Sequence, residues 1–102
     1  GYQAFLAAAK AAGQEAIPAD DQVFDYAEKV GIPEEFLELA FREFEGRYST
    51  NGKLQVGLAG WRQTFRNAVK SNWYRLWWFN PDGACALTTP GIQAQRNAKA
   101  VA

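Results

Sequence analysis

The sequence predicts a mainly α-helical domain, a compact bundle of four to five short helices with one C-terminal β-hairpin. Three observations support this prediction. The 102 residues fit one domain and leave little room for a second. Hydrophobic residues make up 48% and aromatic residues 15% of the chain, which is enough for a buried core. Apolar residues recur at helical spacing in several segments, and a hairpin pattern follows them.

Four segments carry the helical pattern, and residues typical of helix ends surround them. The expected helices cover residues 2–12, 20–30, 33–47 and 58–73. Gly13 and Gly31 follow the first two and favour termination there. The acidic pair Asp20 and Asp21 suits the start of the second helix, where the helix dipole favours negative charge. Pro33 opens the third helix, and its wide apolar stripe predicts a central position in the bundle.

The last quarter of the chain predicts a hairpin and a terminal helix. Apolar runs at 76–79 and 84–88 flank the turn sequence Asn80-Pro81-Asp82-Gly83. Thr89-Pro90 then provides a helix cap followed by proline at the first helical position. A helix over 92–101 is expected to close the chain.

These elements predict one domain over residues 1–102. Its parts are an N-terminal helix at 1–16, a helical core at 17–75, and the hairpin with the terminal helix at 76–102. Within the core, residues 49–60 are expected to form a loop with a turn at Asn51-Gly52.

Charge is unevenly distributed, although the formal total is zero. Residues 1–46 contain ten acidic and three basic residues, a net charge of −7. Residues 47–102 contain one acidic and eight basic residues, a net charge of +7. This asymmetry favours an anionic partner for the second half. The alternative is that the acidic and basic halves fold against each other.

The residue inventory argues against catalysis. The chain lacks histidine, the usual general base near neutral pH. Its single cysteine, Cys85, lies in an apolar run, where a buried role is expected. Gly52-Lys53 lacks the glycine-rich turn of a P-loop, so ATP hydrolysis is not expected. The acidic pairs fall on helix starts and polar faces, which is typical of capping. We therefore predict a domain that is not an enzyme, with no catalytic residues, no cofactor and no metal site.

The expected location is the cytoplasm. A lone thiol fits a reducing compartment. No apolar run approaches the roughly 20 residues that a membrane helix requires. No signal peptide is visible, and no membrane partner is expected.

Aromatic and basic residues are interleaved over residues 61–78. Three of the basic residues, Arg62, Arg66 and Lys70, share one stripe of the expected fourth helix. Proteins that bind single-stranded nucleic acid combine cations along the phosphate backbone with aromatic rings that stack on bases. The candidate nucleic-acid-binding residues are Arg62, Arg66, Lys70, Trp73, Tyr74, Arg75 and Trp77.

The same segment also has a purely structural interpretation. Trp61 and Phe65 lie on the apolar stripe of the helix and are expected in the core. The basic stripe is equally typical of a solvated helix face. The four aromatic residues Trp73, Tyr74, Trp77 and Trp78 cannot all be buried in so small a domain, so at least one is expected at the surface.

Five short motifs follow one another along the chain. They are Ile-Pro-x-Asp-Asp-x-Val-Phe-x-Tyr-Ala (17–27), Gly-Ile-Pro-x-x-Phe-Leu (31–37), Phe-Arg-Glu-Phe-x-x-Arg-Tyr (41–48), Trp-Arg-x-Thr-Phe-Arg-Asn-x-Val (61–69) and Leu-Thr-Thr-x-Gly (87–91). This order resembles the C-terminal region of phage and prophage replication proteins. The middle part is similar to the C-terminal domain of the primosomal protein DnaT, and this resemblance covers about residues 17–78.

The resemblance implies a compact helical bundle that binds single-stranded DNA and helps to load a replicative helicase without hydrolysing ATP. By position, Trp61, Arg62, Phe65 and Arg66 match the Trp-x-x-x-Phe helix of that family. We therefore expect a single-stranded DNA-binding accessory domain of a phage-type protein of DNA replication, acting in a primosome. A replicative helicase or another replication protein is the expected protein partner, and an oligomer is allowed.

Two alternatives stay open. A helix, a hairpin and a terminal helix also resemble the wing end of winged-helix domains, which would make the chain a duplex DNA-binding module. The third interpretation is a non-catalytic protein-interaction domain, in which the acidic half or exposed tryptophans dock a partner.

Overall fold

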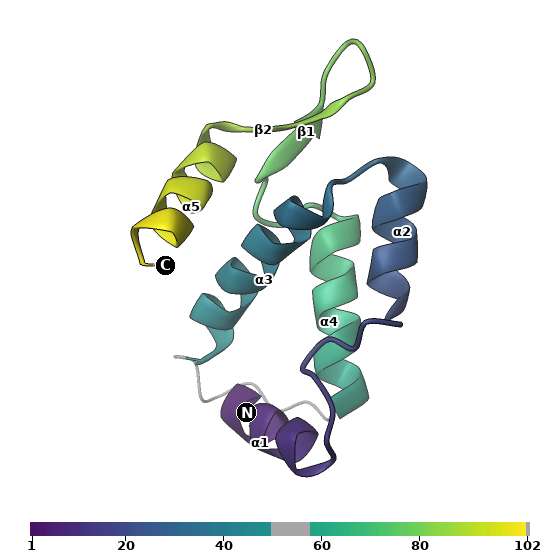
Figure 1. Cartoon of the computed structure of the whole chain (residues 1–102), viewed down its shortest axis with the longest axis vertical. Coiled ribbons are helices and arrows are strands. Elements are labelled where there is room, and N and C mark those ends of the chain that lie inside the picture. Colours follow the sequence, from purple (N-terminus) through teal and green to yellow (C-terminus); the bar gives the residue numbers. More distant parts are fainter. Residues whose placement is uncertain (50–57, 102) are drawn as a thin grey trace.

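The described part of the chain forms five helices and one two-stranded hairpin (Figure 1). The computed structural model describes residues 1–49 and 58–101. The elements are α1 (Tyr2–Ala11), α2 (Gln22–Val30), α3 (Glu34–Ser49), α4 (Leu58–Lys70), β1 (Trp77–Phe79), β2 (Cys85–Leu87) and α5 (Thr89–Ala100). The mainly α-helical prediction is thereby confirmed. The predicted turn at Asn51-Gly52 lies outside the described residues.

Residues in the left-handed backbone conformation end three of the helices. Gly13 (φ 68°) follows α1 and Gly31 (φ 88°) follows α2, as the sequence predicted. Asn72 (φ 49°) does the same after α4. The next amide, of Trp73, donates to the carbonyl of Ala68 at 3.0 Å, the hydrogen bond typical of such a terminus. The prediction of a fourth helix reaching residue 73 was therefore too long.

Side-chain oxygens cap the starts of α2 and α5. Asp21 accepts a hydrogen bond from the backbone N–H of Val23 at 2.9 Å, which confirms the expected acidic start of α2. For α5 the predicted cap was wrong by one residue, and the helix begins at Thr89 instead of residue 92. Thr88, and not Thr89, is the cap, since its Oγ1 accepts from the N–H of Gly91 at 3.1 Å.

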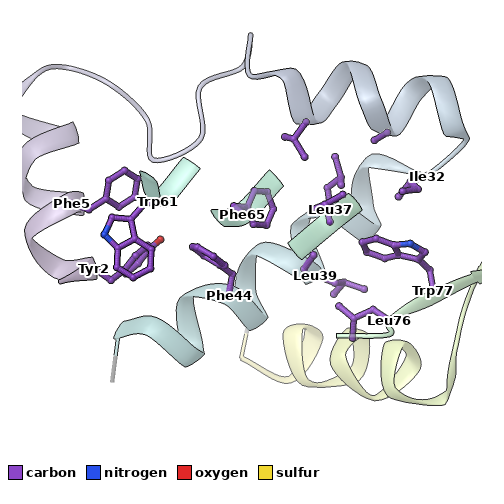
Figure 2. Packing of buried hydrophobic residues seen from close by; sticks show 14 residues of the cluster. Tyr2, Phe5, Ile32, Leu37, Leu39, Phe44, Trp61, Phe65, Leu76 and Trp77 are labelled. Carbon is purple, nitrogen blue, oxygen red and sulfur yellow. The ribbon is translucent and has the colours of Figure 1, made fainter. Parts of the chain in front are cut away.

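Trp61 lies at the centre of an aromatic cluster that joins α1, α3 and α4 (Figure 2). Its ring is fully buried and meets Tyr2, Phe44 and Tyr48 edge-on, with centroid distances of 5.1, 5.9 and 5.0 Å. Edge-to-face contacts of this kind stabilise the fold in addition to the burial of the rings. The N-terminal helix therefore belongs to the same core as the helices that follow it.

Helix α3 is the central element of the bundle. It packs against α1, α2, α4 and α5, which confirms the position that its wide apolar stripe predicted. Figure 1 shows α1 across one end of the molecule and the hairpin at the other. None of the helices in the described ranges combines the length and the hydropathy that a membrane crossing requires.

The hairpin is antiparallel and has the predicted turn. Trp77 pairs with Leu87, and Trp78 pairs with Ala86. The side chain of Asn80 closes the turn by accepting hydrogen bonds from two following backbone N–H groups, each at 3.0 Å. Because neighbouring residues of a strand point to opposite faces, Trp77 enters the core and Trp78 points away from it.

Gly91→Ala tests the close approach of α5 to the chain before β1. A Cβ at Gly91 would overlap the carbonyl oxygen of Leu76 and lie 2.9 Å from its carbonyl carbon. We expect a loss of about 1–3 kcal/mol in the free energy of unfolding, measured by urea denaturation. Gly46→Ala in α3 is the control, because its Cβ would meet no atom within 4 Å. An equal effect of both substitutions would contradict this placement of α5.

Alkaline pH tests the burial of Tyr2. Its hydroxyl donates to Glu45 at 3.1 Å, and burial, together with that carboxylate, raises the pKa of Tyr2 above its ordinary value. The folded protein thus holds this proton more tightly than the unfolded chain. The resulting stabilisation is complete below the ordinary tyrosine pKa of about 10 and is lost as the pH rises above it. In Tyr2→Phe the free energy of unfolding, measured by urea denaturation, should fall less steeply above about pH 10 than in wild type. Equal declines in variant and wild type would count against the contact.

Candidate nucleic-acid interface

Arg62, the first member of the basic stripe on α4, is bonded to the connection between α1 and α2. Its Nε donates to the carbonyl of Ala16 at 3.0 Å. Its Nη2 donates to the carbonyl of Glu15 at 3.0 Å and to the amide oxygen of Gln14 at 3.1 Å. The guanidinium therefore fastens this connection to α4, and three of its hydrogen-bond directions are already used within the protein.

Arg66, one turn further along, forms an ion pair with Asp21. The Nη1 and Oδ2 atoms are 2.7 Å apart, and only 15% of the Arg66 side chain and 5% of the Asp21 side chain are exposed. The same carboxylate caps α2, so the pair joins α4 to the start of α2. In this pair the basic half of the chain packs against the acidic half, which was the alternative to an anionic partner.

Lys70 completes the stripe and is exposed. Its ammonium lies 5.6 Å from the centre of the Tyr26 ring, within the range of a cation–π contact. The three predicted cations do share one side of α4, but Arg62 and Arg66 bind neighbouring segments. The stripe is therefore mainly an anchor of the fold, and only its last member is exposed.

The four tryptophans divide into two buried and two exposed residues. Trp61 and Trp77 are buried, whereas Trp73 and Trp78 are 45% and 50% exposed. The expectation that at least one aromatic residue of this segment reaches the surface is confirmed. Trp77 was predicted to bind nucleic acid, but it is buried and its ring stacks on that of Phe36 with centroids 6.5 Å apart, so it offers no free face.

Phe79 is a surface residue that the sequence did not single out. It is 44% exposed, close to the turn of the hairpin. Its position next to the turn was a signal, because the turn of the hairpin projects away from the helices (Figure 1). Asp82, in the turn itself, is the acidic residue nearest to it along the chain.

Tyr74 and Arg75 lie in the turn between α4 and β1, but their surroundings differ. The guanidinium of Arg47 lies 4.7 Å from the centre of the Tyr74 ring, and burial raises the pKa of Tyr74 to about 12. Tyr74 is therefore packed in place. Arg75 is exposed and has a left-handed backbone (φ 52°), and its carbonyl accepts a hydrogen bond from Thr88.

We use the name hairpin surface for four exposed residues of this region, Trp73, Arg75, Trp78 and Phe79. They fall in one stretch of chain, so the Cα atoms of its first and last members are at most about 20 Å apart. Trp73 precedes β1, and Trp78 and Phe79 point to opposite faces of the hairpin. This surface combines exposed aromatic rings with a single guanidinium.

The described residues show no arrangement suited to a metal ion or a thiol nucleophile. No three acidic or cysteine side chains among them are grouped as metal ligands. Cys85 is half-buried, and this burial raises its pKa, whereas a reactive thiol requires a lowered pKa.

Arg66→Ala and Asp21→Asn test the anchoring role of the ion pair. Each leaves a largely buried partner unpaired, so we expect each to lower the free energy of unfolding by roughly 2–3 kcal/mol. Arg96→Ala, at an exposed arginine of α5, is the control and should change it by less than about 0.5 kcal/mol. Urea denaturation measures all three. If Arg66→Ala were as stable as the control, Arg66 would be free to serve a ligand.

A comparison with protein-family models, with curated proteins and with solved structures finds no match in any of the three. The resemblance to phage replication proteins therefore stays an expectation, and the function must be argued from the residues themselves.

Proposed function

We propose that this chain is a non-catalytic, single-stranded DNA-binding accessory domain of a phage-type replication protein, and that it contacts DNA through the hairpin surface. The observation that carries this proposal is the exposure of Trp73 and Trp78, at 45% and 50%. Indole rings stack on nucleobases without regard to sequence, at about 1–3 kcal/mol per base. Contiguous exposed apolar patches often mark binding sites.

The cations available to DNA are fewer than the sequence suggests. Arg62 and Arg66 are bonded within the protein, which leaves Arg75 and Lys70 as the exposed basic residues nearest to the two tryptophans along the chain. Two phosphate contacts on a single strand correspond to a slope of about −1.4 for log affinity against log salt. Binding should therefore depend more on stacking than on charge.

The packing of α4 does not favour the winged-helix alternative. In such a module the helix before the wing would lie in the major groove of duplex DNA. Here α4 packs against α1, α2 and α3, and two of its arginines bind neighbouring segments. Little of this helix is left to enter a groove.

A protein-interaction role is the second candidate, and the pairing of Arg66 with Asp21 favours it. An aromatic surface with few free cations also suits a protein partner. Helicase loading would require such a contact in addition to DNA binding. Oligonucleotide titration separates the two candidates, because a surface used only for protein would not bind a homopolymeric strand.

Trp78→Ala and Trp73→Ala test the proposed DNA contact. Each should weaken the binding of a labelled oligothymidine by roughly 5- to 100-fold at low salt, because each removes one stacking ring. Fluorescence anisotropy measures the affinity, and quenching of the indoles on binding reports the stacking. Val30→Ala, at an exposed apolar residue of α2, should leave the affinity unchanged. The proposal fails if wild type does not bind at low salt, or if the tryptophan variants bind as well as wild type.

A further inference from the structure

Three hollows lie in a row along one side of α3. Their lining residues all precede the stretch 73–79 that carries the hairpin surface. The first, of about 440 Å³, is lined by Phe24 and Leu37, between α2 and α3. The second, of about 450 Å³, shares both residues and continues to Phe41. The third, of about 540 Å³, shares Phe41 with the second and ends at Leu6 of α1. We call these three adjoining hollows the α3 groove.

The α3 groove follows one side of a single helix. The lining residues of α3 begin at Glu34, continue through Leu37 and Phe41 and end at Glu45. This spacing of three or four residues keeps them on one stripe, about 16 Å long at 1.5 Å per residue. Half-buried rings of Phe24 and Phe41 form apolar parts of its wall. A floor of this length and shape suits an amphipathic helix of about three turns, whose apolar residues recur at the same spacing.

The charges that line the α3 groove indicate which helix fits. Two bases, Lys10 and Arg42, line it together with five acids. The acidic lining residues are Glu15, Glu28, Glu34, Glu38 and Glu45. The first four of these are exposed at the surface. This distribution attracts a basic segment and repels a nucleic acid.

We propose that the α3 groove binds a basic amphipathic helix of a partner protein, with apolar side chains on Phe24, Leu37 and Phe41 and lysines or arginines toward the glutamates. The proposal goes beyond DNA binding and does not depend on it. It rests on α1, α2 and α3 instead of the hairpin, and on negative instead of positive charge.

Two synthetic peptides of about 14 residues test the proposal on the full chain. Both carry leucines at helical spacing, and one has lysines at the flanking positions where the other has glutamates. We expect the basic peptide to bind at least about ten-fold more tightly in fluorescence anisotropy. Its binding should shift the backbone amide signals of Phe24, Leu37 and Phe41 in nuclear magnetic resonance spectra. Equal affinities, or shifts confined to the hairpin, overturn the proposal.

A matched pair of charge reversals makes the test specific to the groove. Glu38→Lys should weaken binding of the basic peptide by roughly five-fold or more, because Glu38 is exposed at the rim. Asp82→Lys makes the same change in net charge at the hairpin turn and should not weaken it. If both reversals act equally, the peptide responds to net charge alone and the groove is not its site.

The two binding proposals fail separately. Trp78→Ala should leave peptide binding unchanged, and Glu38→Lys should not weaken binding of oligothymidine. A chain that binds the peptide but no oligonucleotide keeps the groove and loses the DNA proposal. The reverse outcome overturns the groove alone. One variant that abolishes both activities while still folded would show a single shared surface and would overturn the groove as a separate site.

Discussion

The ion pair between Arg66 and Asp21 determines what the basic half of the chain offers to a partner. A charge taken out of water is costly unless it is paired and hydrogen-bonded. Asp21 meets this requirement for Arg66 and caps α2 with the same carboxylate. Because Arg62 is also bonded within the protein, the positive charge along α4 mostly stabilises the fold. A basic surface that could bind a partner must therefore be formed by residues other than these two arginines.

The same packing places the candidate site at one end of the bundle. One side of α4 carries the aromatic cluster around Trp61, and another carries the two anchoring arginines. The chain leaves this helix through Asn72 and Arg75, two residues with left-handed backbone. Such conformations persist only where the surroundings hold them. Here the Asn72 amide donates to the Trp77 carbonyl and Thr88 donates to the Arg75 carbonyl, so the exposed rings are carried by a fixed turn.

Local signals predicted most of the fold, whereas long-range pairings decided the site. The glycines predicted where α1 and α2 end, whereas α2 begins two residues later than predicted, after its Asp21 cap. The asparagine that ends α4 gave a weaker signal than glycine would have. The hairpin was predictable, yet nothing local distinguishes Trp77 from Trp78, since the strand face that meets α3 decides which ring is buried. The charge asymmetry was visible, but the pairing of Arg66 with a carboxylate 45 positions away was not.

The two proposed surfaces differ in chemistry in a way that makes each selective against the other's ligand. Carboxylates around the α3 groove repel a nucleic acid, and exposed indoles with an arginine offer no counter-charge to a basic helix. Discrimination by repulsion needs no additional contacts, and it strengthens as the salt concentration falls. Together the two proposals predict that the domain holds a strand at the hairpin and a protein along α3 at the same time. Joining two partners in this way requires only that both proposed surfaces stay fixed to one core.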